Sequence, residues 1–552
     1  MSVSVRWRHK GADCRRPRPA PCKCHGNRVQ CRLHQGDVPL TDLLKRLNAL
    51  PAHRLQSLQR GVEKESLRSL PDGQLAMTPH PLALGSALTH PHITTDFCES
   101  QIEMVTGVHP SAEACSAELT ALHQVVARAL AGEGEERLWV SSMPCRLPEL
   151  DTDIPLGQYG RSNIGMAKTV YRRGLGYRYG RRMQTISGIH YNWSLPGTSS
   201  DEYFALIRNF RRHSFLLLWL FGASPAVCSC FVKGQAHELQ ALGANTLHMP
   251  YGTSLRMGRL GYQSDAQSTL AVSYNGLEGY GASLQAAMTQ PYPAYEAIGL
   301  QGPQGVYRQL STTLLQIENE FYGTIRPKRP IRSGERPLHA LRERGVEYVE
   351  VRCMDLDPFE DVGIATSTMR FLDVFLMHCL LADSPPDHPA EIAALGRNQH
   401  LTAARGREPG LMLEREGQPV VLTAWAAELL EACMPIARAL DDAQGLADAP
   451  HQAAVAAAQA SLSAPHTLPS ARVLEAITAQ HGGEFMPFVA ERSAQVQTRL
   501  ESLAWPVDAA QHWASLAADS LAEQARIEST EQWPFEAFRQ HYLAPERLQP
   551  TP

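Results

Sequence analysis

The sequence lacks the short signatures that mark the commonest nucleotide-binding and hydrolytic sites. It contains no GxxxxGK[ST] phosphate loop, no HExxH zinc motif, and no strand, GxGxxG string and helix in succession. It also lacks any repeat of solenoid length and any heptad run long enough for a coiled coil. These absences exclude a standard phosphate-loop enzyme, a zinc protease of the HExxH type, a Rossmann dehydrogenase and a repeat protein.

The chain also lacks an excess of charge of either sign. Its 52 basic and 56 acidic residues give a formal net charge of −4 over 552 residues. A domain that binds nucleic acid or an anionic membrane surface usually carries a basic excess. We therefore expect neither partner, and we expect small-molecule substrates instead. The sequence leaves the oligomeric state open.

Long apolar runs are missing as well, and the N-terminus has no signal-peptide core. The uncharged stretch 214–232 begins with an apolar block, but Ser224 and Pro225 should end a helix near Phe221, too early to cross a bilayer. The twelve cysteines are scattered, which is typical of free thiols in a reducing compartment. We expect a cytoplasmic protein.

Composition divides the chain into three parts. Residues 1–40 are rich in Arg, Pro and Cys without apolar periodicity, which predicts a disordered extension; its cysteines lack the paired spacing of strong zinc sites. Residues 41–383 alternate strand and helix patterns, which predicts an α+β core that carries the catalytic site. Residues 384–552 are Ala-rich, which predicts a helical C-terminal part packed on the core. Helical spacing recurs at 40–50, 201–220, 309–317, 366–381, 423–440, 452–462, 471–480, 485–503 and 509–528.

The string RGVEKESL at 60–67 predicts a strand with two carboxylates on one face. Alternate side chains of a strand share a face, so Glu63 and Glu65 should project together, about 7 Å apart. Two such carboxylates favour a cation between them. They are equally well explained as solvated charges on an exposed strand.

A second acidic string follows at 95–103. Thr95 or Asp96 is suited to begin a helix, on which Asp96, Glu99 and Glu103 would form one stripe. A solvated helix face is the commoner explanation for such a stripe. The first acidic string nevertheless favours a site that the two share.

The string MQTISGIHYNWSLP at 183–196 predicts one long strand. Its even-numbered face carries Gln184, His190 and Asn192, with Gly188 leaving room beside them, while the other face is apolar. A lone histidine is more often a core residue. A histidine with two amides on one face favours a polar site.

Two further strings combine acidic and basic residues. GVEYVEVR at 345–352 predicts a strand with Glu350 and Arg352 on one face, which fits either a site or a structural ion pair. LQIENEFYGTIRPKRPIR at 315–332 is dense in Arg and Lys and suits either phosphate oxygens or a basic surface loop.

If the acidic strings converge, their charges need a counter-ion. Two carboxylates about 4 Å apart repel by roughly 4 kcal/mol at an effective dielectric near 20. Carboxylates with one imidazole suit hard divalent cations such as Mg²⁺ or Mn²⁺. Several such ions in one pocket indicate a nucleoside triphosphate.

The strings taken together resemble the proteobacterial-type glutamate-cysteine ligases. The resemblance rests on RGVEKESLR, LGSALTHPHITTDF, SMPC, MQTISGIHYNWSLP, LFGASPAVC, MPYGTSLRMGRLGY, IENEFYGTIRPKR and GVEYVEVRCMDLDPF, and it runs from about Gln59 to Asp383. It implies a glutamine-synthetase-like fold, in which a curled antiparallel sheet forms a funnel surrounded by helices. It also implies that ATP drives the joining of L-cysteine to the γ-carboxylate of L-glutamate through a γ-glutamyl phosphate, the first step of glutathione biosynthesis.

The resemblance also implies roles for individual residues, with ATP as co-substrate and Mg²⁺ (or Mn²⁺) as the metal. The metal ligands would be Glu63, Glu65, Asp96, Glu103, His190 and Glu350. Glutamate or its developing phosphate would be held by Gln184, Asn192, Arg256 and Arg352, and the cysteine side chain by Tyr171, Tyr262 and Tyr322. Glu350 and Arg352 would be the catalytic pair.

Two other functions stay open from the sequence. The chain could be a related carboxylate-amine ligase that uses another amine, which exchange of cysteine for other amines would reveal. It could also be a non-catalytic metal- or nucleic-acid-binding protein whose working part is the Cys-rich extension. Unchanged ligase activity after removal of residues 1–38 would exclude the second alternative.

Overall fold

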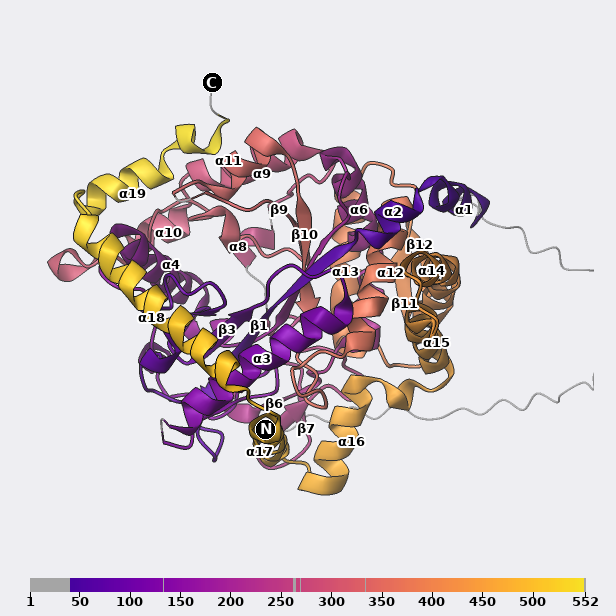
Figure 1. Ribbon diagram of the computed structural model, residues 1–552, viewed down its shortest axis with the longest axis horizontal. Coiled ribbons are helices and arrows are strands. Elements are labelled where there is room, and N and C mark those ends of the chain that lie inside the picture. The colour runs from indigo at the N-terminus through magenta and orange to yellow at the C-terminus, as the bar shows by residue number, and fades with distance from the viewer. Residues whose placement is uncertain (1–39, 133, 262–264, 269, 333, 551–552) are drawn as a thin grey trace, which may run out of the picture.

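The computed structural model describes residues 40–132, 134–261, 265–268, 270–332 and 334–550. Its centre is a seven-stranded antiparallel sheet with strand order β2-β3-β1-β5-β10-β9, and β4 pairs with one end of β1 (Figure 1). The strands of this sheet are β1 (Gln59–Ser69), β2 (Ile93–Thr95), β3 (Gln101–Val105), β4 (Arg137–Leu138), β5 (Ile189–Ser194), β9 (Ile325–Lys328) and β10 (Tyr348–Met354). Two smaller antiparallel sheets contain β6 (Ala226–Cys228), β7 (Gln240–Ala241), β8 (Thr246–His248), β11 (Met412–Arg415) and β12 (Gln418–Val421).

Helices surround the central sheet. Those before residue 384 are α1 (Leu40–Ala49), α2 (Ala52–Gln56), α3 (Ala112–Ala131), α4 (Asn163–Tyr179), α5 (Arg181–Gln184), α6 (Ser200–His213), α7 (Phe215–Phe221), α8 (Asp265–Ser268), α9 (Leu277–Thr289), α10 (Pro293–Ile298), α11 (Pro337–Arg344) and α12 (Thr366–Leu381). The later ones are α13 (Pro389–Arg405), α14 (Leu422–Gln444), α15 (Pro450–Ser463), α16 (Pro469–His481), α17 (Phe485–Ser502), α18 (Val507–Thr530) and α19 (Phe535–Leu543). In Figure 1 the yellow helices α18 and α19 run along one side of the molecule, past α4.

The two faces of the central sheet differ in polarity. β5 directs Ile189, Tyr191 and Trp193 into the main hydrophobic core, and β10 directs Val349 and Val351 there. Helices α3, α6, α7 and α12 cover this apolar face, so the alternation of a strand leaves its polar side chains on the opposite face. The polar face is therefore the place to look for a site.

A buried ion pair joins α12 to β1. Arg60 Nη2 lies 3.0 Å from Asp373 Oδ2, and both side chains are only 1% exposed. The hydroxyl of Tyr191 donates a hydrogen bond of 2.7 Å to Asp373 Oδ1. This contact fixes the strand that carries Glu63 against the core.

Replacing Asp373 by asparagine should destabilise the protein by about 3 to 5 kcal/mol, because it leaves the Arg60 charge buried without a counter-charge. Urea unfolding measures the effect. Asp383→Asn is a suitable control, since Asp383 pairs with Arg46 at the surface, with the Asp383 side chain 57% exposed. Equal unfolding midpoints for the two variants would refute the importance of the buried pair.

Most predicted elements are confirmed. The strands predicted at 60–67 and 345–352 correspond to β1 and β10, and the helical patterns near 40–50, 201–220 and 366–381 correspond to α1, α6 with α7, and α12. The five helices predicted after residue 422 are α14 to α18. An α+β arrangement with an antiparallel sheet is thus confirmed. Among the described helices, none combines the length and hydropathy that crossing a membrane requires.

Three predicted elements are wrong. Asp96 and Glu103 do not share a helix, because residues 101–105 pair with β1 and Asp96 lies in the turn between β2 and β3. The strand predicted at 183–196 begins only at Ile189, and Gln184 ends the short helix α5. Residues 309–317 form no helix, since the Arg178 guanidinium binds the carbonyls of Ser311 and Leu314. In the first and third of these segments, contacts with distant parts of the chain outweigh local spacing.

Two predictions concern residues outside the described ones. These are the disordered extension, of which residues 1–39 are not described, and Tyr262. The predicted division at residue 383 stays a prediction, and one hydrophobic cluster combines residues from both sides of it, from Leu43 to Leu548.

Candidate active site

The polar face of the central sheet forms the floor of a pocket of about 550 Å³. Strand register brings its acidic side chains together, since Glu65 lies opposite Glu103 across β1 and β3, and Glu63 lies opposite His190 across β1 and β5. We call the following side chains of the pocket lining the acidic group: Glu63, Glu65, Asp96, Glu103, His190 and Glu350.

His190 lies in the middle of the acidic group. Its Nδ1 is 3.1 Å from Glu63 Oε2 and 3.8 Å from Glu350 Oε1, and its Nε2 is 3.7 Å from Glu65 Oε1. One donor atom each of Glu63, Glu103 and His190 lies within 4.8 Å of the other two. His190 Nε2 is buried and has no hydrogen-bond partner among the described residues. A nitrogen of this kind, facing carboxylates, suits a cation.

Basic side chains offset the negative charge of some carboxylates in the acidic group but not of others. Burial and the nearby Asp96 raise the pKa of Glu65 to about 8 and that of Glu103 well above its ordinary value. Burial also opposes ionisation of Glu350, but Lys328 and Arg352 outweigh it and hold the pKa of Glu350 well below its ordinary value. The carboxyl groups that basic side chains do not compensate are therefore those of Glu65 and Glu103 on β1 and β3, where the raised pKa values favour the protonated form until a cation binds.

A basic group lies on β9 and β10, at the other side of the floor. Lys328 Nζ is 3.2 Å from Glu350 Oε1, Arg352 Nη1 is 3.2 Å from Glu350 Oε2, and Arg326 Nη1 is 3.9 Å from the same oxygen as Arg352. Guanidinium and ammonium groups suit phosphate and carboxylate oxygens. One side of the pocket can thus hold cations and the other can hold anions.

Helix α4 closes the pocket from above the sheet. Its residues Lys168, Tyr171, Arg172 and Leu175 line the pocket, at the spacing i, i+3, i+4, i+7 of one helical face. Residue-by-residue reasoning from the sequence missed Lys168 and Arg172, although helical spacing from Tyr171 would have found both. It treated Arg326 and Lys328 only as part of a basic string, although strand alternation would have put them on one face.

Ten of the thirteen predicted site residues line this pocket, including Tyr171, Gln184 and Tyr322. Gln184 Nε2 donates a hydrogen bond of 2.8 Å to the Tyr322 hydroxyl. Asn192 and Arg256 lie just behind the lining: Asn192 Nδ2 donates to Glu63 Oε1 at 2.9 Å, and Arg256 Nη2 donates to the Arg352 carbonyl at 2.9 Å. Tyr262 is outside the described residues.

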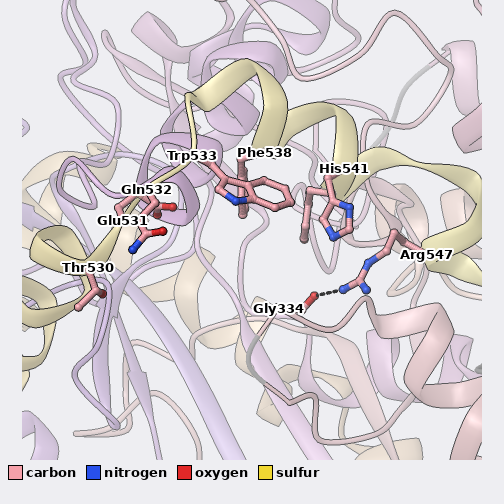
Figure 2. A pocket seen from close by; sticks show the side chains of 9 residues that line it. Gly334, Thr530, Glu531, Gln532, Trp533, Phe538, His541 and Arg547 are labelled. Carbon is pink, nitrogen blue, oxygen red and sulfur yellow. Dashed lines mark hydrogen bonds between the residues drawn. The ribbon is translucent and has the colours of Figure 1, made fainter.

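A second pocket of about 400 Å³ adjoins the first, at Gly334 and Tyr542 (Figure 2). The turn after α18 and helix α19 line it with Trp533, Phe538 and His541, and Arg547 Nη2 donates to the Gly334 carbonyl at 2.8 Å. Since Ile527 and Tyr542 also line the main pocket, the C-terminal segment forms part of its wall.

Comparison with known proteins gives one consistent result. The sequence profile of the family described as glutamate-cysteine ligase matches residues 44–402, which include all strands of the central sheet. The glutamate-cysteine ligase of Saccharophagus degradans is 45% identical over 511 residues, which cover 88% of this chain and 94% of that protein. The glutamate-cysteine ligase of Azotobacter vinelandii is 46% identical over 525 residues, with 91% and 98% covered.

The solved structures give the same likeness in three dimensions. The crystal structure of the glutamate-cysteine ligase of Francisella tularensis in complex with AMP matches with a TM-score of 0.84 and 34% identity. The match covers 89% of this chain and 98% of the Francisella chain. The fold described above is therefore shared over nearly its whole length.

Proposed function

Since the chain belongs to the glutamate-cysteine ligase family, we propose that it uses ATP to join the amine of L-cysteine to the γ-carboxylate of L-glutamate. The product is γ-glutamylcysteine, and the reaction is the first step of glutathione biosynthesis. The observation that carries the proposal is the pocket in which the acidic group faces Lys328, Arg326 and Arg352.

Magnesium is the metal that the acidic group fits best. Its oxygen-rich donor set suits a hard divalent cation, and the buried His190 Nε2 supplies a ligand atom without another partner among the described residues. The proposed ligands are Glu63, Glu65, Asp96, Glu103, His190 and Glu350. These residues would hold Mg²⁺ or Mn²⁺, and either ion would offset part of the negative charge of the ATP phosphates.

The reaction needs activation of glutamate, because a carboxylate by itself is a poor acylating agent. In the first step a γ-carboxylate oxygen attacks the γ-phosphorus of ATP, and ADP leaves with the bond electrons. In the second step the cysteine amine attacks the acyl carbon, the bond to phosphate breaks, and the departing phosphate takes up the extra proton of the nitrogen. The part of Arg352 is to hold the transferred phosphoryl group beside Glu350, where its guanidinium already lies.

The two amino acids are assigned to neighbouring parts of the pocket, which meet where Gln184 donates a hydrogen bond to the Tyr322 hydroxyl. Gln184, Arg256 and Arg352 hold glutamate, since arginine binds carboxylate in a bidentate manner. Asn192 has a buried Oδ1 without a partner among the described residues, which can accept a hydrogen bond from a substrate, while its Nδ2 orients Glu63. The aromatic side chains Tyr171, Tyr322 and Tyr262 receive the cysteine thiol, a soft group that gains from contact with rings.

Replacing Gly188 by alanine should reduce kcat/KM about tenfold, mainly by raising the KM for glutamate. A Cβ atom at Gly188 would collide with the guanidinium of Arg256, which is 1% exposed and has little room to move. Steady-state kinetics with varied glutamate measure the change. Gly396→Ala on α13 is the matched control, because nothing lies within 4 Å of a Cβ atom there. Unchanged KM for glutamate in Gly188→Ala would argue against the role of Arg256.

We infer that the sheet is the curled, funnel-like sheet of glutamine-synthetase-like enzymes, with a catalytic core at 41–383 and a helical part at 384–552. The polar and apolar faces of the sheet support this, since a funnel needs one face for ligands and one for packing. Free thiols and the use of ATP favour a cytoplasmic location.

An ADP-release assay on the purified full-length chain tests the function. With Mg²⁺ and ATP, continuous ADP release should require both glutamate and cysteine, and mass spectrometry should identify γ-glutamylcysteine. Much faster release with another amine would favour the related carboxylate-amine ligase. Absence of ADP with every amine tried would overturn the proposal.

A further inference from the structure

A second set of metal-binding side chains lies between α6 and α12, on the apolar side of the central sheet. One ring nitrogen each of His213 and His378 and the Sγ of Cys379 lie within 4.8 Å of one another. His213 ends α6, and His378 and Cys379 are neighbours in α12. The two imidazole rings are 5.6 Å apart between centroids. We call these three residues the His-Cys triad.

The imidazoles of the triad carry polar atoms without partners. Nδ1 of His213 and Nδ1 of His378 are both buried, and neither makes a hydrogen bond among the described residues. His378 is only 4% exposed. A buried imidazole normally satisfies its nitrogens through hydrogen bonds, water or a metal. Two unsatisfied imidazoles beside a thiol are therefore unusual for a simple hydrophobic core.

The protonation states of the triad suit a cation. Burial lowers the pKa of His378 to about 4, and burial together with the nearby His378 lowers the pKa of His213 well below its ordinary value. Both rings are thus neutral at pH 7, which is the form that binds metals. Burial raises the pKa of the Cys379 thiol, so an arriving cation would have to displace that proton.

The charges around the triad do not exclude a cation. The nearby cations Arg212 and Arg415 are each paired with a carboxylate, Glu391 and Glu428, at 2.6 Å. They therefore oppose a dication less than free arginines would. His213 is the last residue of α6 and is only partly buried, so the triad lies near the surface of the protein.

We propose that His213, His378 and Cys379 bind a borderline-soft divalent cation, Zn²⁺ above all, at a site separate from the ligase pocket. Two imidazoles and a thiolate are typical zinc ligands, and the fourth tetrahedral position is left for water. The oxygen-rich acidic group prefers Mg²⁺, so the two sites select different cations by ligand chemistry. The bound ion ties the end of α6 to the last turn of the core helix α12.

Cobalt is a direct probe of this site, because thiolate-bound Co²⁺ gives a charge-transfer absorption that carboxylate-bound Co²⁺ lacks. The protein for the test is the full-length chain with Cys14, Cys22, Cys24 and Cys31 replaced by serine, so that the N-terminal thiols contribute nothing. Titration should show this absorption, and one equivalent of Zn²⁺ should abolish the part due to the triad. No substrate is present, so the outcome does not depend on the proposed ligase function.

Three variants in that background assign the absorption. Cys379→Ser should lower the amount of thiolate-bound Co²⁺ by one equivalent, whereas Cys115→Ser, which changes a buried thiol 3.7 Å from Thr106 Oγ1, should lower it by none. Should Cys379→Ser fail to fold, His213→Asn at the partly exposed position keeps the thiol and should weaken Co²⁺ binding at least tenfold. The proposal is overturned if Cys379→Ser and His213→Asn bind Co²⁺ with the stoichiometry and affinity of the parent, or if the parent shows no thiolate absorption.

Discussion

Replacing Glu63 by glutamine should lower ligase turnover at least about 100-fold and leave the protein folded. Glu63 accepts hydrogen bonds from His190 Nδ1 at 3.1 Å and from Asn192 Nδ2 at 2.9 Å, so its carboxylate has a fixed position at the centre of the acidic group. Glutamine has nearly the same shape but no charge, and it is a poor ligand for Mg²⁺. A 100-fold loss corresponds to about 2.7 kcal/mol of transition-state stabilisation.

The unfolding temperature of Glu63→Gln distinguishes a lost ligand from a damaged fold. Without Mg²⁺ it should lie only slightly below that of the parent. Burial and Glu350 oppose the charge of Glu63, but the hydrogen bond from His190 and the charge of Lys328 outweigh them and lower its pKa, so the loss of the charge costs a little stability. Glu347→Gln is the matched control: Glu347 is 51% exposed, pairs with Arg329 at 3.6 Å and lies three residues before Glu350. Near-normal dipeptide production by Glu63→Gln would count decisively against the metal assignment.

Replacing Arg352 by lysine should lower kcat about 100-fold, even though it conserves the charge. The Arg352 guanidinium lies 3.2 Å from Glu350 and faces the part of the pocket assigned to the phosphoryl group. A planar fork can bind two oxygens at once, whereas an ammonium binds as a point charge, so the variant should position the transferred group poorly. The rate of ADP formation in a single-turnover experiment measures this step separately from product release.

Arg329→Lys makes the same exchange just beyond β9. There the guanidinium donates to the Gly345 carbonyl at 2.7 Å and lies away from the pocket lining, so kcat should change less than twofold. If Arg352→Lys also retained full kcat, the phosphoryl group would have to be held elsewhere, with Lys328 as the next candidate.

The sequence predicts the strands of the site well because their polarity alternates. Glu63, His190 and Glu350 each follow the two-residue period of a strand next to apolar residues that face the core. That period gives the face of each side chain, and the family resemblance implies that these side chains share one metal site. Neither gives the order of the strands, which the structure supplies. Local spacing alone could not have placed Glu63 opposite His190, because pairing joins residues more than a hundred positions apart.

The parts that the sequence does not predict depend on long-range contacts. Glu103 fits a helical stripe as well as a strand, and its pairing with Glu65 decides between them. Lys168 and Arg172 can be assigned to the pocket only when α4 is known to lie over the sheet. The His-Cys triad combines residues 213 and 378, whose local patterns are those of ordinary amphipathic and buried helices.

The contribution of Ile527 and Tyr542 to the main pocket has a consequence for biosynthesis. The strands of the pocket floor are complete once residue 354 has been synthesised, but Ile527 and Tyr542 come among the last residues of the chain. A ribosome-bound chain therefore carries an open, unfinished main pocket for as long as it takes to translate the intervening helices. Catalytic competence can arise only when the C-terminal segment has been released and has docked beside α4.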